Sequence, residues 1–346
     1  MDLTEKEIMS QHEALKKTYD LFMDKKDETE KFFEKNGQRK FTILGCGSSY
    51  MLAKSAARLL SAVENTEATA IAGGDLLIHE EYYKNNIKDS IVIVLSRSGQ
   101  TSEIVRDIEM IRKDFDVPVV TMTMKDDNAL MPMSELDFTM DWCYDKSVCQ
   151  TRTVTNLYAA MLLFTALYSG DDKLVDAVRK AVDANEAYKE DNRPTLKAIA
   201  QKDWENAIVL ADGALTGLAE EGALAFSEIA MLPGQCFNML DYRHGPIVLN
   251  GEKTLTIVLL SPEGGQLEAD MIADLKTHNG ILVTVSTEED NRFDADAHIC
   301  VGDIDDFRAE GIPFIYVMQM LAYEKSKQLG RNPDAPTGLD AFITLK

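Results

Sequence analysis

The chain has 346 residues, of which 45% are hydrophobic, so it is a globular protein whose length suits two domains of ordinary size. Its 58 acidic and 36 basic residues give a formal net charge of −22, which argues against nonspecific binding to nucleic acid or to an anionic membrane, since both are polyanions. A small anionic substrate is compatible with this charge only if its site is locally positive or rich in backbone N–H groups.

Cysteine content and hydropathy both favour a cytoplasmic location. The five cysteines are odd in number and form no Cys-x-x-Cys pair, which is typical of a reducing compartment. No apolar stretch approaches the ~20 residues that a membrane span requires, and the charged N-terminus does not resemble a secretory signal.

Residues 1–36 are charged and follow a helical pattern, so they predict an N-terminal helix. Strands and helices then alternate. The predicted strands lie at 41–44, 91–95 and 117–122, and the predicted helices at 48–63, 101–113, 153–168 and 171–188. The polar stretch 189–202, which contains Pro194, is interpreted as a linker.

The alternation restarts after this stretch. The predicted strands lie at 207–211, 255–260, 281–285 and 298–301, and the predicted helices at 216–232, 265–275 and 312–329. Such alternation predicts an α/β protein in which helices cover both faces of a parallel sheet.

The second half of the chain repeats the first. A shift of 166 positions sets 43–47 on 209–213 and 98–100 on 264–266, and a shift of 163 sets 117–127 on 280–290. Three matches in the same order predict two tandem copies of one α/β unit. The expected domains are 37–190 and 203–330, followed by a tail over 331–346.

A hydroxyl-rich segment, Ser96-Arg97-Ser98-Gly99-Gln100-Thr101, joins a buried strand to a helix. A glycine lets the backbone approach a ligand closely, and a helix N-terminus offers N–H groups and partial positive charge, so this turn is a candidate phosphate site. The alternative is that the hydroxyls only cap the helix.

A second loop of this kind, Gly45-Cys46-Gly47-Ser48-Ser49, follows the preceding predicted strand. It is not a dinucleotide-binding fingerprint, because Tyr50 stands where the third glycine belongs, and this argues against a nucleotide-dependent oxidoreductase. Because adjacent strand ends of a parallel sheet open on one crevice, we expect the two loops to serve one ligand.

The repeat provides an internal comparison for the hydroxyl-rich turn. Pro262, Glu263 and Gly264 occupy the positions of Ser96, Arg97 and Ser98 in the second copy. Proline removes a backbone N–H donor and glutamate repels phosphate. The second copy therefore keeps the α/β unit but lacks the residues that would bind a phosphate. This asymmetry favours a ligand site in the first copy.

Two further segments carry acid–base groups. Glu221 and Glu228 are seven residues apart on one predicted helix, and Gly222 and Ala225 between them leave room for a ligand. His244 follows in the sequence His-Gly-Pro. A carboxylate and an imidazole suit proton transfer at a sugar. The alternative is that the two glutamates lie on a solvated helix face and that the histidine is only a turn residue.

Over residues 35–346 the chain resembles the double sugar-isomerase (SIS) domain family. The resemblance rests on four motifs in the family's order: Gly-Cys-Gly-Ser-Ser, Ser-x-Ser-Gly-x-Thr, Glu-Gly-Ala-Leu-x-x-x-Glu and His-Gly-Pro. The resemblance implies two tandem flavodoxin-like domains with three α/β/α layers. It also implies a homodimer or larger homo-oligomer, because the family's histidine comes from a neighbouring subunit.

The resemblance assigns roles to individual residues. It implies that Glu228 moves a proton between C1 and C2, that His244 assists ring opening, and that a loop at Ser147 and Val148 closes the first site. The residues expected to bind substrate are Cys46, Gly47, Ser48, Ser49, Ser96, Arg97, Ser98, Gln100, Thr101, Ser147, Val148 and Glu221. No cofactor is expected. The other histidines show no spacing typical of metal ligands, so no metal is expected either.

Departures from the family pattern narrow the expected chemistry. Two lysines of the glucosamine-6-phosphate synthase branch are replaced here by Ala225 and, in the tail, by Ala341, and no glutaminase domain is expected. We therefore expect an enzyme that isomerises a 6-phosphorylated amino sugar or ketosamine, with release of ammonia or an amine, as in deaminases and deglycases. The alternative is a noncatalytic phosphosugar-binding regulator, which would need neither Glu228 nor His244.

Overall fold

The structure is a computed structural model that describes residues 2–37, 39–340 and 345. Its contacts divide the chain into two compact units. The first unit contains residues 13–37, 39–146, 152–178, 340 and 345, and the second contains residues 2–12, 147–151 and 179–339.

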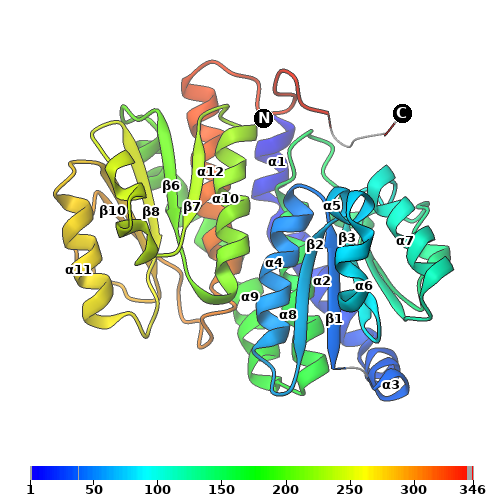
Figure 1. Cartoon of the computed structure of the whole chain (residues 1–346). Coiled ribbons are helices and arrows are strands. Elements are labelled where there is room, and N and C mark those ends of the chain that lie inside the picture. Colours follow the sequence, from blue (N-terminus) through cyan, green and yellow to red (C-terminus); the bar gives the residue numbers. More distant parts are fainter. Residues whose placement is uncertain (1, 38, 341–344, 346) are drawn as a thin grey trace. The chain divides into compact units, whose positions relative to one another are not determined.

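The first unit is built on a five-stranded parallel sheet in the order β2-β1-β3-β4-β5 (Figure 1). Its strands are β1 (Lys40–Gly45), β2 (Glu67–Ala72), β3 (Ile91–Ser96), β4 (Val119–Thr123) and β5 (Leu136–Thr139). The helices that lie among them in the chain are α4 (Ser48–Ser61), α5 (Gly73–Ile78), α6 (Glu80–Ile87), α7 (Ser102–Asp114) and α8 (Arg152–Ser169).

Helices cover both faces of this sheet. Ile104, Ile108 and Ile111 of α7 pack with Val92 and Val94 of β3 on one face, together with apolar side chains of α5 and α6. On the other face, aromatic rings join the sheet to α8: Phe41 contacts Tyr168, and Phe138 contacts Phe164. The unit therefore has the three expected α/β/α layers.

The second unit repeats this arrangement with a five-stranded parallel sheet in the order β10-β9-β8-β6-β7. Its strands are β6 (Asn206–Leu210), β7 (Gly234–Phe237), β8 (Thr254–Leu259), β9 (Ile281–Ser286) and β10 (Ala297–Cys300). Its helices include α10 (Thr216–Glu228), α11 (Gly265–Lys276) and α12 (Gly311–Gln328). When the strands are numbered from the first strand of each unit, both sheets have the order 2-1-3-4-5. The predicted internal repeat is therefore confirmed.

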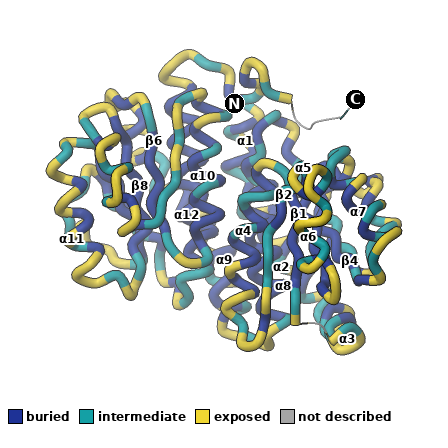
Figure 2. The backbone as a smooth tube through the Cα atoms, viewed as in Figure 1, coloured by how far each residue is buried: buried dark blue, intermediate teal, exposed yellow. Residues whose placement is uncertain are grey.

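The central strands of the two sheets are fully buried. Every residue of β3 and of β8 is buried, whereas the outer faces of α3 (Lys26–Asn36) and α11 are exposed (Figure 2). Three strands, β2, β5 and β7, were not predicted. All three lie at sheet edges, where partly exposed residues interrupt the apolar pattern.

Two expectations about helices are wrong. The N-terminal region is not one helix but three: α1 (Leu3–Met9), α2 (Gln11–Asp24) and α3. The predicted linker is also helical, because α9 runs from Asp172 to Ala200 with Pro194 inside it. Most of its polar residues are exposed, while Lys189, Leu196 and Ala200 are buried at spacings of seven and four, which is a helical period.

Candidate active site

The two predicted ligand loops leave neighbouring strand ends in the first unit. Strands β1 and β3 pair directly, with Leu44 opposite Val94, so the loops that follow them start side by side. Gly47 has φ of 55°, a left-handed conformation that suits glycine, and it directly precedes α4. Ser48 and Ser49, in the first turn of α4, are buried.

The hydroxyls of the loop after β3 hold the loop itself. The Gly99 N–H donates to Ser96 Oγ over 3.0 Å, and the Gln100 N–H donates to Ser98 Oγ over 3.1 Å. Thr101 is the residue before α7, and its side chain makes no capping hydrogen bond to that helix. The capping alternative therefore does not explain these hydroxyls. They fix a tight turn at the helix N-terminus.

The loop that contains Asp127 and Asn128 packs against this turn. A Cβ atom on Gly99 would lie 2.5 Å from Asn128 Cβ, so only glycine allows this close approach, and φ of 60° at Gly99 also requires it. The Asn128 amide bonds to Thr123 Oγ1 and to the Lys125 carbonyl. The Gln100 side chain donates to the Asp127 carbonyl over 3.2 Å.

Positive charge gathers beside the turn despite the acidity of the chain. The buried Arg97 guanidinium lies 5.8 Å from the centroid of the Tyr144 ring, and the Lys125 ammonium lies 5.0 Å from it. Cations over a tyrosine ring are attracted by its π electrons. The local positive charge that an anionic ligand requires is therefore present.

A buried carboxylate, that of Asp107, lies near Cys46 in the loop after β1. Neither carboxylate oxygen of Asp107 has a hydrogen-bond partner among the described residues, and the side chain is fully buried. Burial, reinforced by the nearby Glu103 carboxylate, raises the pKa of Asp107 to about 8. Burial and the same two carboxylates raise the pKa of Cys46 to about 11. Cys46 is therefore a neutral thiol near pH 7, which suits a packing and contact role rather than nucleophilic attack.

The corresponding loop of the second unit holds a carboxylate of the chain itself. Glu268, in the first turn of α11, accepts a hydrogen bond from the Ser261 N–H over 2.7 Å and is 4% exposed. A Cβ atom on Gly264 would lie 1.9 Å from the Glu268 carboxyl carbon. Burial and the charge of Asp212 raise the pKa of Glu268. The turn that is lined with hydroxyls in the first unit is thus filled by a carboxylate in the second.

Glu228 lies in a pocket of the second unit. It is the last residue of α10 and is partly buried, and the pocket is open to solvent, with a volume of about 580 Å³. Met231 adopts φ of 53°, and the Leu232 N–H bonds back to the Phe226 carbonyl, so the helix ends in a left-handed turn just beyond Glu228. Residues Pro336–Leu339 of the tail also line the pocket.

The residues around Glu228 differ from expectation in one respect. Gly222 does not leave room for a ligand, because a Cβ atom there would lie 2.5 Å from the Met318 side chain of α12. Ala225 and Glu221 are buried, and neither lines the Glu228 pocket. The small residues of α10 therefore allow close packing of two helices.

Three other predicted residues have well-defined surroundings. His244 is exposed, follows the short 3₁₀ turn Asp241–Arg243 and does not line the Glu228 pocket of its own chain. Ser147 is buried and donates from both its N–H and its hydroxyl to the Glu7 carboxylate, and the Val148 N–H donates to the Asp334 carbonyl. Ala341 lies outside the described residues.

The described residues contain no cluster of three or more potential metal ligands. Within the same ranges, no helix is long and apolar enough to cross a membrane.

The two sheets, their order and the loops at their strand ends define a protein with two tandem flavodoxin-like α/β units. Residues 36–170 match the SIS domain family model. The first unit therefore belongs to the SIS domain family, and the second unit repeats its sheet topology.

Several relatives have similar chains. The isomerizing glutamine–fructose-6-phosphate aminotransferase of Sulfurisphaera tokodaii is 26% identical over 351 residues, which cover 99% of this chain and 56% of that protein. The chain spans about half the length of the curated relatives it matches. Tagatose-6-phosphate ketose/aldose isomerase from Escherichia coli has a TM-score of 0.85 at 22% identity, covering 97% of this chain and 96% of its own. Glucosamine-6-phosphate deaminase from Thermotoga maritima has a TM-score of 0.78 at 20% identity, covering 95% and 100%.

Proposed function

We propose that this protein is a phosphosugar isomerase that transfers a proton between C1 and C2 of a 6-phosphorylated ketosamine or amino sugar and releases an amine or ammonia. The difference between the two strand-end turns carries this proposal. A hydroxyl-lined turn beside Arg97 and Lys125 suits an anion, whereas the turn filled by Glu268 repels one. The names of the relatives, which act on sugar 6-phosphates, support the same substrate class.

The phosphate would bind at the turn after β3. Backbone N–H groups at the start of α7 and the hydroxyls of Ser96, Ser98 and Thr101 would donate to it, and the helix dipole would add a favourable charge. Ser48 and Ser49, with Cys46 and Gly47, would contact the sugar from the neighbouring loop. Hydrogen bonds to a charged group are worth about 1.5–3 kcal/mol each, so a few of them suffice for selective binding.

Glu228 would act as the base. In the open-chain ketosamine it would take a proton from C1 to give the 1,2-enaminol, and it would return a proton to C2. The product has a C1–N double bond that one water molecule hydrolyses to an aldose 6-phosphate and the free amine. The partly buried position of Glu228 at the wall of a pocket suits a base that must reach two adjacent carbons.

His244 would open the sugar ring or protonate the leaving nitrogen. Because it is exposed and does not line the Glu228 pocket of its own chain, it suits a role at the site of a second copy in a homodimer or larger homo-oligomer. Ala225 and Ala341 stand where the synthase branch has lysines, so this mechanism uses only the glutamate and the histidine.

A noncatalytic phosphosugar sensor is the second candidate, because the phosphate turn alone would serve it. The test is to incubate the protein with ketosamine 6-phosphates and with glucosamine 6-phosphate and to measure released sugar 6-phosphate with a coupled dehydrogenase. We expect release from at least one compound. Tight binding of these compounds without any turnover would instead identify a sensor.

A further inference from the structure

Helix α1 is fixed to its neighbours by several polar contacts within the second unit. It lies beside α12 (Figure 1). The Tyr323 hydroxyl of α12 donates to the Glu5 carboxylate over 3.0 Å, and Arg193 of α9 forms an ion pair with the same carboxylate. The buried Glu7 carboxylate accepts a hydrogen bond from the Ser147 N–H over 3.3 Å. Because these contacts come from three different segments, α1 can hold other segments in place.

Asp334, in the C-terminal tail, binds the first turn of α1. Its carboxylate accepts from the Leu3 and Thr4 N–H groups, over 2.9 and 2.8 Å, and from the buried Thr4 hydroxyl over 2.8 Å. N–H groups in the first turn of a helix have no partner within it, and the helix dipole favours a carboxylate there. The Asp334 carbonyl accepts from the Val148 N–H over 3.0 Å. Asp334 therefore joins the tail, α1 and the loop at 147–151.

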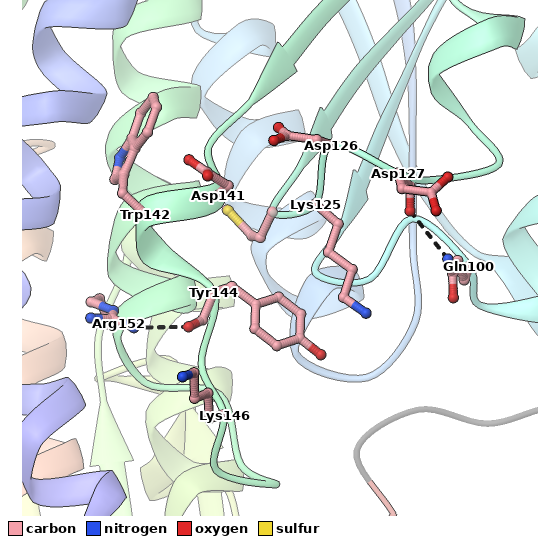
Figure 3. A pocket seen from close by; sticks show the side chains of 10 residues that line it. Gln100, Lys125, Asp126, Asp127, Asp141, Trp142, Tyr144, Lys146 and Arg152 are labelled. Carbon is pink, nitrogen blue, oxygen red and sulfur yellow. Dashed lines mark hydrogen bonds between the residues drawn. The ribbon is translucent and has the colours of Figure 1, made fainter.

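The loop at 147–151 begins and ends at a pocket of the first unit. Lys146 and Arg152, on either side of the loop, line an open pocket of about 530 Å³ beside the turn after β3 (Figure 3). Arg152 also pairs with the buried Asp145 carboxylate, so the base of the loop is fixed. The loop itself bonds to α1 and to Asp334. A loop that is expected to contact the substrate therefore shares Asp334 with the tail.

The tail beyond Asp334 forms a wall of the Glu228 pocket. Residues 336–339 line this pocket together with Glu228. Before Asp334, the Arg331 side chain donates to the Ala230 carbonyl, two residues after Glu228. The tail is thus fixed at two points, and only one residue separates the second point from the pocket wall. The contact between Asp334 and α1 therefore determines where the wall begins.

We propose that Asp334 is a positioning residue, which holds the tail on α1 so that segment 336–339 confines the reacting carbons of the substrate beside Glu228. Asp334 does not line the pocket, so it acts through the wall. The inference rests on the proposed function, and it gives α1 a role in the reaction. A misplacement of about 1 Å at a reacting centre costs up to about 10²-fold in rate, because the bound carbons no longer lie in line with the base.

Asp334→Ala removes the three hydrogen bonds that the carboxylate accepts. We expect kcat to fall about 10–100-fold on any substrate that the wild-type protein converts, because the wall is displaced. The Kd for a sugar 6-phosphate should stay within about threefold, since the turn after β3 makes none of these contacts. Asp334→Asn keeps one carbonyl oxygen for Thr4 and should lose less than Asp334→Ala. Circular dichroism and denaturant unfolding show whether each variant is folded.

Variants of Thr4 test the same contact from the side of α1. Thr4→Val keeps the shape of the side chain but removes the hydroxyl, so it should lower kcat, and Thr4→Ser should retain it. The double variant Thr4→Val/Asp334→Ala should be no slower than Asp334→Ala alone, because both changes act through one contact. The matched control is Thr29→Val, which changes a buried threonine of α3 in the first unit and should keep wild-type kcat.

Hydrogen exchange measured by mass spectrometry tests the contact without turnover. Peptides that cover residues 2–9 and 335–340 should exchange faster in Asp334→Ala than in the wild type, and at the wild-type rate in Thr29→Val, because the tail and the first turn of α1 lose their common partner.

Unchanged kcat and unchanged exchange in a folded Asp334→Ala would overturn the inference. A fall in phosphosugar affinity as large as the fall in kcat would also overturn it, because it would show a general structural defect. If Asp334→Ala does not fold, equal kcat in Thr4→Val and Thr4→Ser decides against the inference. Each of these results leaves the proposed function standing. If the wild-type protein converts no substrate, the proposed function fails, and the exchange rates alone decide whether Asp334 holds the wall.

Discussion

At the scale of single residues, the environment of Asp107 controls part of the pH dependence of stability. Its pKa is about 8 in the folded chain and ordinarily near 3.8, so the folded state keeps a proton that the unfolded state releases. Unfolding therefore releases a proton between these two values, and stability falls as the pH rises from about 4 to about 8.

Replacing Asp107 by asparagine should remove this dependence. Asparagine is neutral at every pH, so Asp107→Asn should be more stable than the wild type by roughly 1–3 kcal/mol at pH 8 and should lose the advantage at pH 4–5. Denaturant unfolding at several pH values measures both effects. The control is Asp114→Asn, at the exposed end of the same helix. An unchanged pH slope in Asp107→Asn would show that the carboxylate is solvated.

Residues such as Asp107 and Glu268 could not be singled out from the sequence. A carboxylate in an amphipathic helix is normally solvated, and nothing in its neighbours signals burial. The hydroxyls of Ser96 and Ser98 were recognisable because they cluster with a glycine at a strand-to-helix junction. The hydrogen bonds that these hydroxyls accept from the turn could not be predicted, because they depend on the backbone conformation, which the sequence does not specify.

At the scale of structural elements, the same turn occurs twice with opposite electrostatic character, so the chain contains its own control. Ser96→Ala/Ser98→Ala removes two hydroxyls from the turn before α7. We expect phosphosugar affinity to fall by several kcal/mol, since charge-assisted bonds are worth roughly 1.5–3 kcal/mol each.

The matched control is Ser261→Ala, whose hydroxyl accepts from the Glu263 N–H at 3.2 Å in the turn before α11. Calorimetric titration with a sugar 6-phosphate should show wild-type affinity for this variant. If both variants bind like the wild type, the phosphate site lies elsewhere. Equal loss in both would mean that the second turn also binds ligand, despite Glu268.

The central strands and long helices were predictable because they have a continuous apolar run or a clear helical period. The edge strands β2, β5 and β7 were missed because few of their residues are buried, and because β5 and β7, with four residues each, resemble loops. The length of α9 was underestimated because the polar stretch 189–202, which contains Pro194, was interpreted as a linker. A proline inside a long helix removes only one backbone hydrogen bond, and packing of Leu196 and Ala200 offsets that loss.

At the scale of the whole molecule, the internal repeat was the most informative feature of the sequence. It predicted two parallel sheets of one topology, and the structure has them. It also made the turn after β3 a candidate ligand site, because a feature present in one copy and lost in the other is not required by the fold. The strong net negative charge is a global property that does not describe the local charge of Arg97 and Lys125 beside the turn after β3.

The central claim is that Glu228 moves the proton, and the most direct measurement is the turnover number of Glu228→Gln together with its affinity for a sugar 6-phosphate. Glutamine keeps the shape and hydrogen bonding of the side chain but cannot act as a base. We predict that kcat falls by roughly 10²–10⁴-fold while Kd stays within a few-fold of the wild type, and that Glu220→Gln, on the same helix, keeps wild-type kcat. Wild-type turnover in Glu228→Gln would contradict the mechanism and would make Glu228 a structural residue at the end of α10.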